Sequence, residues 1–130
     1  MQTITAPIAS KISYTSEDLS FLAARAADDR KAGDMTLLKI SGVSFIADYL
    51  LIVTGFSRAQ LRAISESVQE QVKAAYDLLP ISTEGASHGD WVLVDYGDVI
   101  VHIMSPDGRE FYNLEAFWGH GELINLPVFD

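Results

Sequence analysis

The sequence lacks cysteine, and it also lacks long apolar runs. Without cysteine the chain can form neither disulfides nor thiolate zinc sites, and it has no cysteine nucleophile, which fits a reducing compartment. The longest apolar runs, such as residues 49–53, fall far short of the roughly 20 residues that a membrane-spanning helix needs. The first residues have no apolar core of the kind found in a signal peptide. We therefore predict a protein that does not enter a membrane.

Basic residues are scarce, with 9 Lys and Arg against 18 Asp and Glu, which leaves a formal net charge of −9. A negative field repels the phosphate backbone, so we predict no direct nucleic-acid specificity. The same field favours a basic protein as partner. An acidic composition also serves solubility alone, so the charge by itself identifies no partner.

The length of 130 residues, with 48% hydrophobic and 21% charged residues, is typical of one globular domain. We divide the chain into a flexible leader at 1–14, a domain at 15–118 and a tail at 119–130. Apolar residues are frequent in the tail, which is compatible with docking on the domain. The sequence contains no internal repeat and no interdomain linker.

The periodicity of apolar residues predicts three helices and five strands. The first helix begins at the N-cap Ser16 and ends before Gly33, and the second runs from a capping box of Ser57 and Gln60 to near Tyr76. The third helix is predicted over 109–118, and the strands over 35–40, 49–54, 81–84, 91–94 and 99–103. This order predicts an α/β domain with a mixed five-stranded sheet flanked by helices.

The last two strands flank a predicted turn over 95–98 and form a hairpin. A turn of this even length places Val94 opposite Val99 and Trp91 opposite His102. One face then carries only valines, and the other is mixed and carries Trp91, Leu93, Asp95, Asp98, Ile100 and His102. Two interpretations of Trp91 stay open. It is either an aromatic anchor of a recognition surface, or a half-buried residue at the sheet edge next to a His102 that makes a local hydrogen bond.

Three patterns point weakly to catalysis or metal binding. The segment GFSRA at 55–59 follows a strand as a nucleophile elbow does, but Ala59 stands where that motif requires glycine, and Ser57 already serves as a cap. Acidic residues at 48, 95 and 98 could belong to a metal-dependent nucleotidyl transfer site, yet they form no Asp-x-Asp pair. The histidines at 88, 102 and 120 lack metal-ligand spacing. We predict no catalytic residue, cofactor or metal, with a nucleotide-using enzyme as the alternative.

Several segments match a known family in order and spacing. They are KAGD at 31–34, ADY at 47–49, VTGFS at 53–57, EG at 84–85, WVLVDYGDVIVH at 91–102 and REFYNLEAFW at 109–118. On these segments the chain resembles the ribosomal silencing factor family, also called the RsfS or Iojap family, from about residue 19 to residue 118.

The resemblance implies a compact α/β domain of nucleotidyltransferase-like topology without a catalytic site. It implies a translation repressor that binds the large ribosomal subunit through that subunit's fourteenth protein and sterically blocks small-subunit association. Family members are cytoplasmic in bacteria or organellar, and many form homodimers. The resemblance associates Trp91 with the ribosomal-protein contact and makes Asp95, Tyr96 and Asp98 candidate co-contacts. The residues His102, Arg109 and Tyr112 also match motif positions, as contacts or as scaffold.

Overall fold

The computed structural model describes residues 13–85 and 89–129, so most of the predicted leader and His88 lie outside the described residues. The elements follow the chain as α1 (Ser16–Asp28), β1 (Gly33–Lys39), β2 (Tyr49–Thr54), α2 (Arg58–Tyr76), β3 (Ser82–Glu84), β4 (Trp91–Asp95), β5 (Val99–Met104), α3 (Pro106–Tyr112), α4 (Leu114–Phe117) and β6 (Glu122–Ile124). No helix within these described ranges is both long and apolar enough to cross a membrane.

The strands form one mixed sheet in the order β3-β4-β5-β2-β1-β6. The contact between β2 and β5 is parallel, and the other neighbours are antiparallel. The predicted α/β class with a mixed sheet flanked by helices is therefore confirmed, but the predicted count of five strands is wrong. The sixth strand, β6, pairs with β1 so that Leu123 lies opposite Leu38. A three-residue strand is too short to show an alternating pattern in the sequence.

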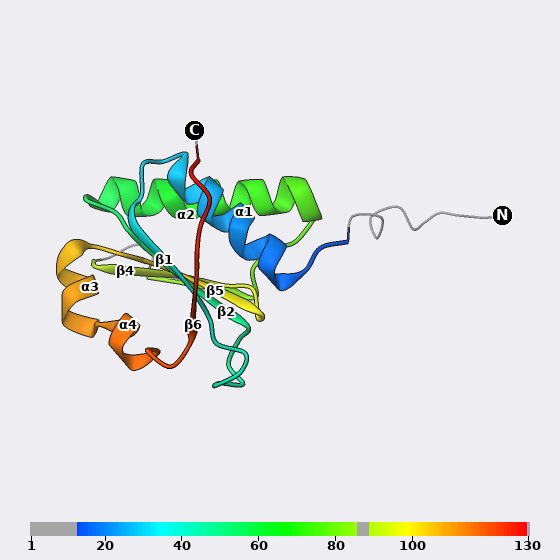
Figure 1. The fold of residues 1–130 in the computed structure, drawn as a ribbon. Helices are drawn as coiled ribbons and strands as arrows, with labels where there is room; N and C mark the ends of the chain where they lie inside the picture. Colours follow the sequence, from blue (N-terminus) through cyan, green and yellow to red (C-terminus); the bar gives the residue numbers. More distant parts are fainter. Residues whose placement is uncertain (1–12, 86–88, 130) are drawn as a thin grey trace.

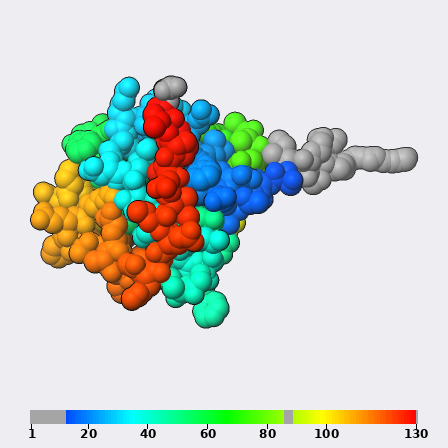
Figure 2. Space-filling model, viewed as in Figure 1, coloured from blue at the N-terminus to red at the C-terminus, as the bar shows by residue number. Residues whose placement is uncertain are grey.

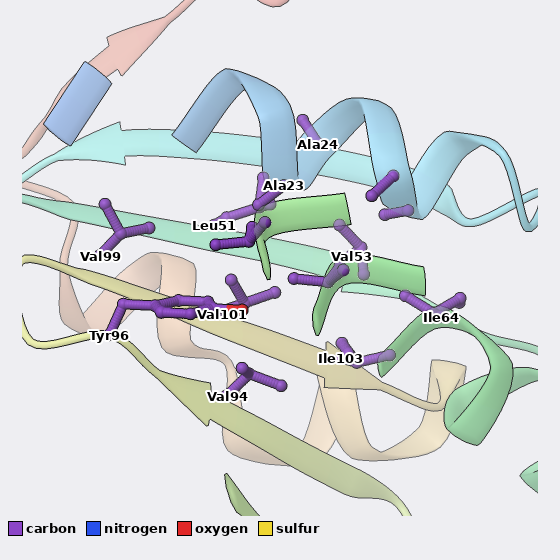
Figure 3. Packing of buried hydrophobic residues seen from close by; sticks show 14 of the residues in the cluster. Ala23, Ala24, Leu51, Val53, Ile64, Val94, Tyr96, Val99, Val101 and Ile103 are labelled. Atoms are coloured by element: carbon purple, nitrogen blue, oxygen red, sulfur yellow. The ribbon is translucent and has the colours of Figure 1, made fainter. Parts of the chain in front are cut away.

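The helices α1 and α2 cover one face of the sheet, while α3 and α4 lie on the other (Figure 1). Ala23 and Ala24 of α1 pack with Ile64 of α2 over the valine-rich face of the strands (Figure 3). Small side chains on α1 allow close packing, and Ser67 Oγ of α2 donates to Ala26 O at 2.8 Å. The prediction that the valines of the hairpin form a core face is confirmed.

The ends of the first two helices differ in part from the predictions. The N-cap of α1 is Thr15 rather than Ser16, because the Thr15 side chain accepts from Asp18 N and the Asp18 carboxylate accepts from Thr15 N. The helix ends at Asp28, and Gly33 begins β1 instead of terminating the helix. For α2 the predicted N-cap is confirmed, since Ser57 Oγ accepts from Gln60 N at 3.0 Å. The Gln60 side chain accepts from Phe56 N rather than from Ser57 N, so the reciprocal bond of the predicted capping box is wrong.

The predicted helix over 109–118 is wrong, because two short helices meet at Asn113. Asn113 has a φ of 48°, in the left-handed region that asparagine tolerates better than most residues. Ser105 caps α3 and Pro106 stands in its first turn, so this helix also begins earlier than predicted. As a result Phe111 and Phe117 are exposed, whereas Leu114 and Trp118 pack against a second core on the α3–α4 side of the sheet.

The C-terminal segment lies along the surface beside β1 and α1, and it crosses the front of the molecule in Figure 2. Beyond β6, Leu126 and Phe129 pack against the core between the helices and the sheet. At the start of the described chain, Tyr14 stacks on Tyr76 of α2 with ring centroids 4.2 Å apart. Residues on both sides of the predicted 15–118 domain therefore contact it.

Candidate partner-binding surface

The register of the β4–β5 hairpin differs from the prediction by two residues. Trp91 lies opposite Met104, and His102 lies opposite Leu93. The reason is a tighter turn, in which Tyr96 N donates to Val99 O at 2.9 Å and Gly97 adopts a φ of 92°. A shift by an even number of residues keeps every side chain on its face. Trp91 and His102 therefore still share the mixed face, although they are diagonal rather than direct neighbours.

Three side chains from three elements form what we call the aromatic cluster: Trp91 of β4, His102 of β5 and Tyr112 of α3. Trp91 Nε1 donates to His102 Nδ1 at 2.9 Å. The rings of Trp91 and Tyr112 have centroids 4.6 Å apart and an interplanar angle of 49°. Trp91 is half-buried and Tyr112 is 47% exposed, so part of the cluster faces solvent.

The imidazole of His102 is neutral in this setting. The residue is only 7% exposed, and burial lowers its pKa from 6.5 to about 4, while the nearby Asp95 acts in the opposite direction. An indole N–H can only donate, so Nδ1 must accept and the imidazole proton resides on Nε2. The histidine thus acts as a hydrogen-bond acceptor for the tryptophan.

Two pockets border the aromatic cluster, and both carry acidic residues. One of about 260 Å³ is lined by Glu84, Gly85, Trp91 and Leu93. A larger one of about 490 Å³ is lined by Asp90, Asp107, Gly108, Glu110, Phe111 and Tyr112. Phe111 is 80% exposed and its ring meets Tyr112 edge-on. We call the combined lining of these two pockets the acidic aromatic surface.

Hydrogen bonds join the start of α3 to Asp90, the residue that precedes Trp91. Asp90 O accepts from Ser105 N at 2.9 Å, and Asp90 Oδ1 accepts from Ser105 Oγ at 2.9 Å. A Cβ at Gly108 would lie 2.8 Å from Asp90 O, so only glycine permits this close approach without a shift. These contacts hold α3, and with it Tyr112, beside the strand that carries Trp91.

Arg109 is a structural residue in this arrangement. Its guanidinium donates to Thr36 Oγ1 and Thr54 Oγ1 at 2.9 Å each, and it also donates to the carbonyl of Asp34. It forms a bidentate pair with Glu115, whose pKa is lowered chiefly by the hydrogen bond from Arg109. The side chain is 12% exposed, so its donors point into the protein and join α3 and α4 to the sheet.

The predicted contacts at the hairpin turn lie at the other end of β4 from Trp91, although Asp95 is a diagonal neighbour of His102 across the hairpin. Asp95 is four positions beyond Trp91 along β4, roughly 13 Å at the usual rise per strand residue. Its Oδ1 accepts from Gly97 N at 2.7 Å, which makes it a turn residue. Asp98 receives hydrogen bonds at its backbone carbonyl from Asp48 N and Tyr49 N.

Tyr96 does not lie on the mixed face. Its side chain is only 6% exposed and packs in the core beneath α1 and α2 (Figure 3). Burial raises the pKa of its hydroxyl to about 12. The prediction of Tyr96 as an exposed co-contact is therefore corrected, because side chains alternate between the two faces of a strand.

Several residues of the acidic aromatic surface were missed from the sequence. They are Glu84, Asp90, Asp107, Glu110 and Phe111. A signal was present, because the segment 107–112 combines acidic and aromatic residues directly after a Ser-Pro helix start. The helix predicted over 109–118 obscured it, because that helix places Phe111 on one face with Leu114, Phe117 and Trp118.

The residues considered for catalysis have structural roles where the structure describes them. Ser57 Oγ caps α2 and His102 Nδ1 is bonded to Trp91. Within residues 13–85 and 89–129, no group of three or more His, Cys, Asp or Glu side chains is placed to hold a metal ion.

Comparison with known proteins identifies the family. The family described as "Ribosomal silencing factor during starvation" (RsfS) matches residues 13–129. A ribosomal silencing factor RsfS from Zymomonas mobilis is 36% identical over 124 residues, which cover 95% of this chain and 92% of that protein. One from Bacillus subtilis is 41% identical over 105 residues, covering 81% of this chain and 88% of that protein.

A crystal structure of a protein from Chromobacterium violaceum has the same fold, with a TM-score of 0.78 and 36% identity, covering 89% of this chain and 92% of that chain. The matched family is described by a regulatory role and not by a reaction, which agrees with the prediction that the protein is not an enzyme. The match also extends to β6 and the residues after it. The chain belongs to the ribosomal silencing factor family.

Proposed function

We propose that this protein binds the large ribosomal subunit through the subunit's fourteenth protein. It blocks association with the small subunit by occupying the surface at which the two subunits meet. Family membership supports a role in silencing ribosomes. The observation that carries the proposal is the acidic aromatic surface, where a half-buried Trp91 and an exposed Tyr112 lie between pockets lined by carboxylates.

The composition of this surface suits a basic protein better than RNA. Aromatic side chains that are partly buried against a scaffold contribute much of the free energy of binding at protein interfaces. The carboxylates of Asp107 and Glu110 attract basic side chains and repel phosphate. The net charge of −9 extends the same preference to the whole molecule.

Replacing the central aromatic side chain tests the binding site. The variant Trp91→Ala should bind purified large subunits about 30-fold more weakly, because truncation of an interface anchor costs about 2 kcal/mol. The measurement is co-sedimentation with large subunits over a concentration series. Phe45→Ala is the matched control, since Phe45 is a fully exposed aromatic residue in the β1–β2 connection. Wild-type affinity in a folded Trp91→Ala variant would contradict the proposed site.

A steric mechanism has a stoichiometric signature. Sucrose gradients of separated subunits mixed with the protein should show joined ribosomes decreasing until one protein is present for each large subunit. Inhibition at far lower ratios would indicate turnover and would rule out simple occupancy.

We extend the proposal to the cytoplasm as compartment and to a homodimer as a state of the free protein. The bacterial sources of these two relatives support the cytoplasm, and relatives named as chloroplastic or mitochondrial keep an organelle as the alternative. Light scattering after size-exclusion chromatography tests the dimer, because one chain has a mass of 14.3 kDa.

The nucleotidyltransferase-like topology implied by the family resemblance stays a prediction, and titration calorimetry with ATP and magnesium tests whether it carries nucleotide binding.

A further inference from the structure

We infer that His102 is a positioning residue, which holds the Trp91 indole by its N–H and thereby presents the ring of Trp91, rather than its hydrogen-bond donor, to the partner. This inference rests on the proposed function, because it assigns roles within the proposed binding surface. The family resemblance left His102 open as a contact or as scaffold, and this inference assigns it to the scaffold.

The hairpin register explains how the two side chains meet. Diagonal pairs on one face of an antiparallel ladder are within reach of aromatic side chains. His102 lies opposite Leu93 on β4 and pairs with Ile52 on β2, so apolar neighbours flank it on both sides. The bond from Trp91 Nε1 to His102 Nδ1 measures 2.9 Å. The acceptor is therefore held in a rigid, central part of the sheet.

The indole is fixed from two directions. His102 holds its N–H edge, and the ring of Tyr112 packs against it with centroids 4.6 Å apart. A side chain that is already ordered loses less conformational entropy on binding, which strengthens association. Because the single donor of the indole is occupied inside the protein, the partner gains ring area and cation–π contact from Trp91 and no hydrogen bond.

A purely structural role does not explain a histidine at this position. Burying even a neutral imidazole costs the desolvation of its two polar nitrogens, a cost that hydrogen bonds inside the protein must offset. Between Leu93 and Ile52, a leucine would fill the strand position without this cost. The feature that a leucine lacks is the acceptor for the Trp91 N–H.

Two substitutions of His102 introduce side chains of nearly the same shape as each other, and only one of these side chains has a hydrogen-bond acceptor. His102→Asn retains an acceptor near the place of Nδ1, whereas His102→Leu removes it. Binding to large subunits should weaken roughly tenfold in His102→Leu and less than about threefold in His102→Asn. In a Trp91→Phe background, which has no N–H, the two substitutions should have equal effects. Equal effects of the two substitutions in both backgrounds would overturn the inference.

The outcome for Trp91→Ala separates this inference from the proposed function. If Trp91→Ala binds normally, the proposed surface is wrong. If Trp91→Ala weakens binding but His102→Leu and His102→Asn behave alike with Trp91 present, only the role of His102 is wrong.

A measurement on the wild-type chain needs neither ribosomes nor a folded variant. The indole N–H resonance of Trp91 in a ¹⁵N-correlated NMR spectrum should exchange with solvent at least tenfold more slowly than that of Trp118, which is also half-buried. Equal exchange rates for the two indoles would show that the bond does not persist in solution, and would overturn the inference.

Discussion

Neighbouring residues of one sequence motif have different roles in this protein. Asp95 closes a turn and Tyr96 packs under the helices, although both belong to the segment at 91–102 that matches the family. Further along the same motif set, Arg109 bonds inward while Tyr112 reaches solvent. The face and phase of each element therefore decide which motif residues are free to contact a partner.

His102 should make stability depend on pH. Its pKa in the folded protein is about 4, below the 6.5 of a free imidazole, so between these values the unfolded state binds one more proton. The contribution of His102 to the free energy of unfolding is therefore fully present above pH 6.5, and it is lost as the pH falls toward 4. We expect the free energy of unfolding to be about 2 kcal/mol lower at pH 5 than at pH 7.5 from this residue.

Urea unfolding followed by circular dichroism at the two pH values measures this effect. His102→Asn should lose this part of the pH dependence, whereas His120→Asn should keep it, because His120 is exposed between α4 and β6. An unchanged pH dependence in His102→Asn would contradict the assignment.

At the scale of elements, close backbone contacts shape the edge of the acidic aromatic surface. Gly85 has a φ of 81°, and a Cβ there would lie 2.1 Å from Trp91 O. Gly89 has a φ of 73°, but a Cβ there would meet no atom of the described residues within 4 Å. The two glycines thus share a backbone conformation and differ in packing.

This pair gives a matched test. Gly89→Ala should cost about 1 kcal/mol of stability, from the left-handed backbone alone. Gly85→Ala should cost at least about 2 kcal/mol more, because the β3–β4 connection must move away from Trp91. Chemical denaturation of the two variants measures the difference, and equal losses would show that the close approach is not needed.

Arg109 should determine whether α3 and α4 stay on the sheet. Arg109→Lys keeps the charge but loses the planar fork that bonds Thr36, Thr54 and Glu115 together. We expect a loss of about 2 kcal/mol in the free energy of unfolding and faster amide hydrogen exchange in α3 and α4. Arg62→Lys, at an exposed position of α2, should change stability by less than about 0.5 kcal/mol. Comparable effects of the two substitutions would contradict this role.

At the scale of the whole molecule, the charge of −9 should govern encounter with a basic protein. The association rate with the isolated fourteenth protein of the large subunit should fall roughly tenfold between 50 and 300 mM salt, because ions screen long-range attraction. Stopped-flow mixing measures it. The double variant Asp107→Asn with Glu110→Gln should associate more slowly and show a weaker salt dependence. A rate independent of salt would argue against electrostatic steering.

Local patterns in the sequence determined much of the fold. The bounds of β2 and the cap and end of α2 were predicted, because a strand buried on both faces and a capped amphipathic helix each have a continuous local signal. The two faces of the hairpin were also predicted, since alternation survives a register shift of two residues. The placement of Trp91 and His102 on the same face followed from the same alternation, although the predicted pairing of the two residues was wrong.

The remaining features depend on residues far apart in the chain, and only the tertiary structure decided them. The strand β6 forms because β1 offers an unpaired edge, and Arg109 points inward because Thr36 and Thr54 meet it there. The break at Asn113 lets Leu114 of α4 and Trp118, the residue that follows this helix, pack on the second core. The sequence by itself determined the class, the faces and the family motifs, because these are encoded within a few residues. The hairpin register and the Trp91–His102 hydrogen bond could be determined only from the folded chain, because they depend on which residues that are separated in the sequence come into contact.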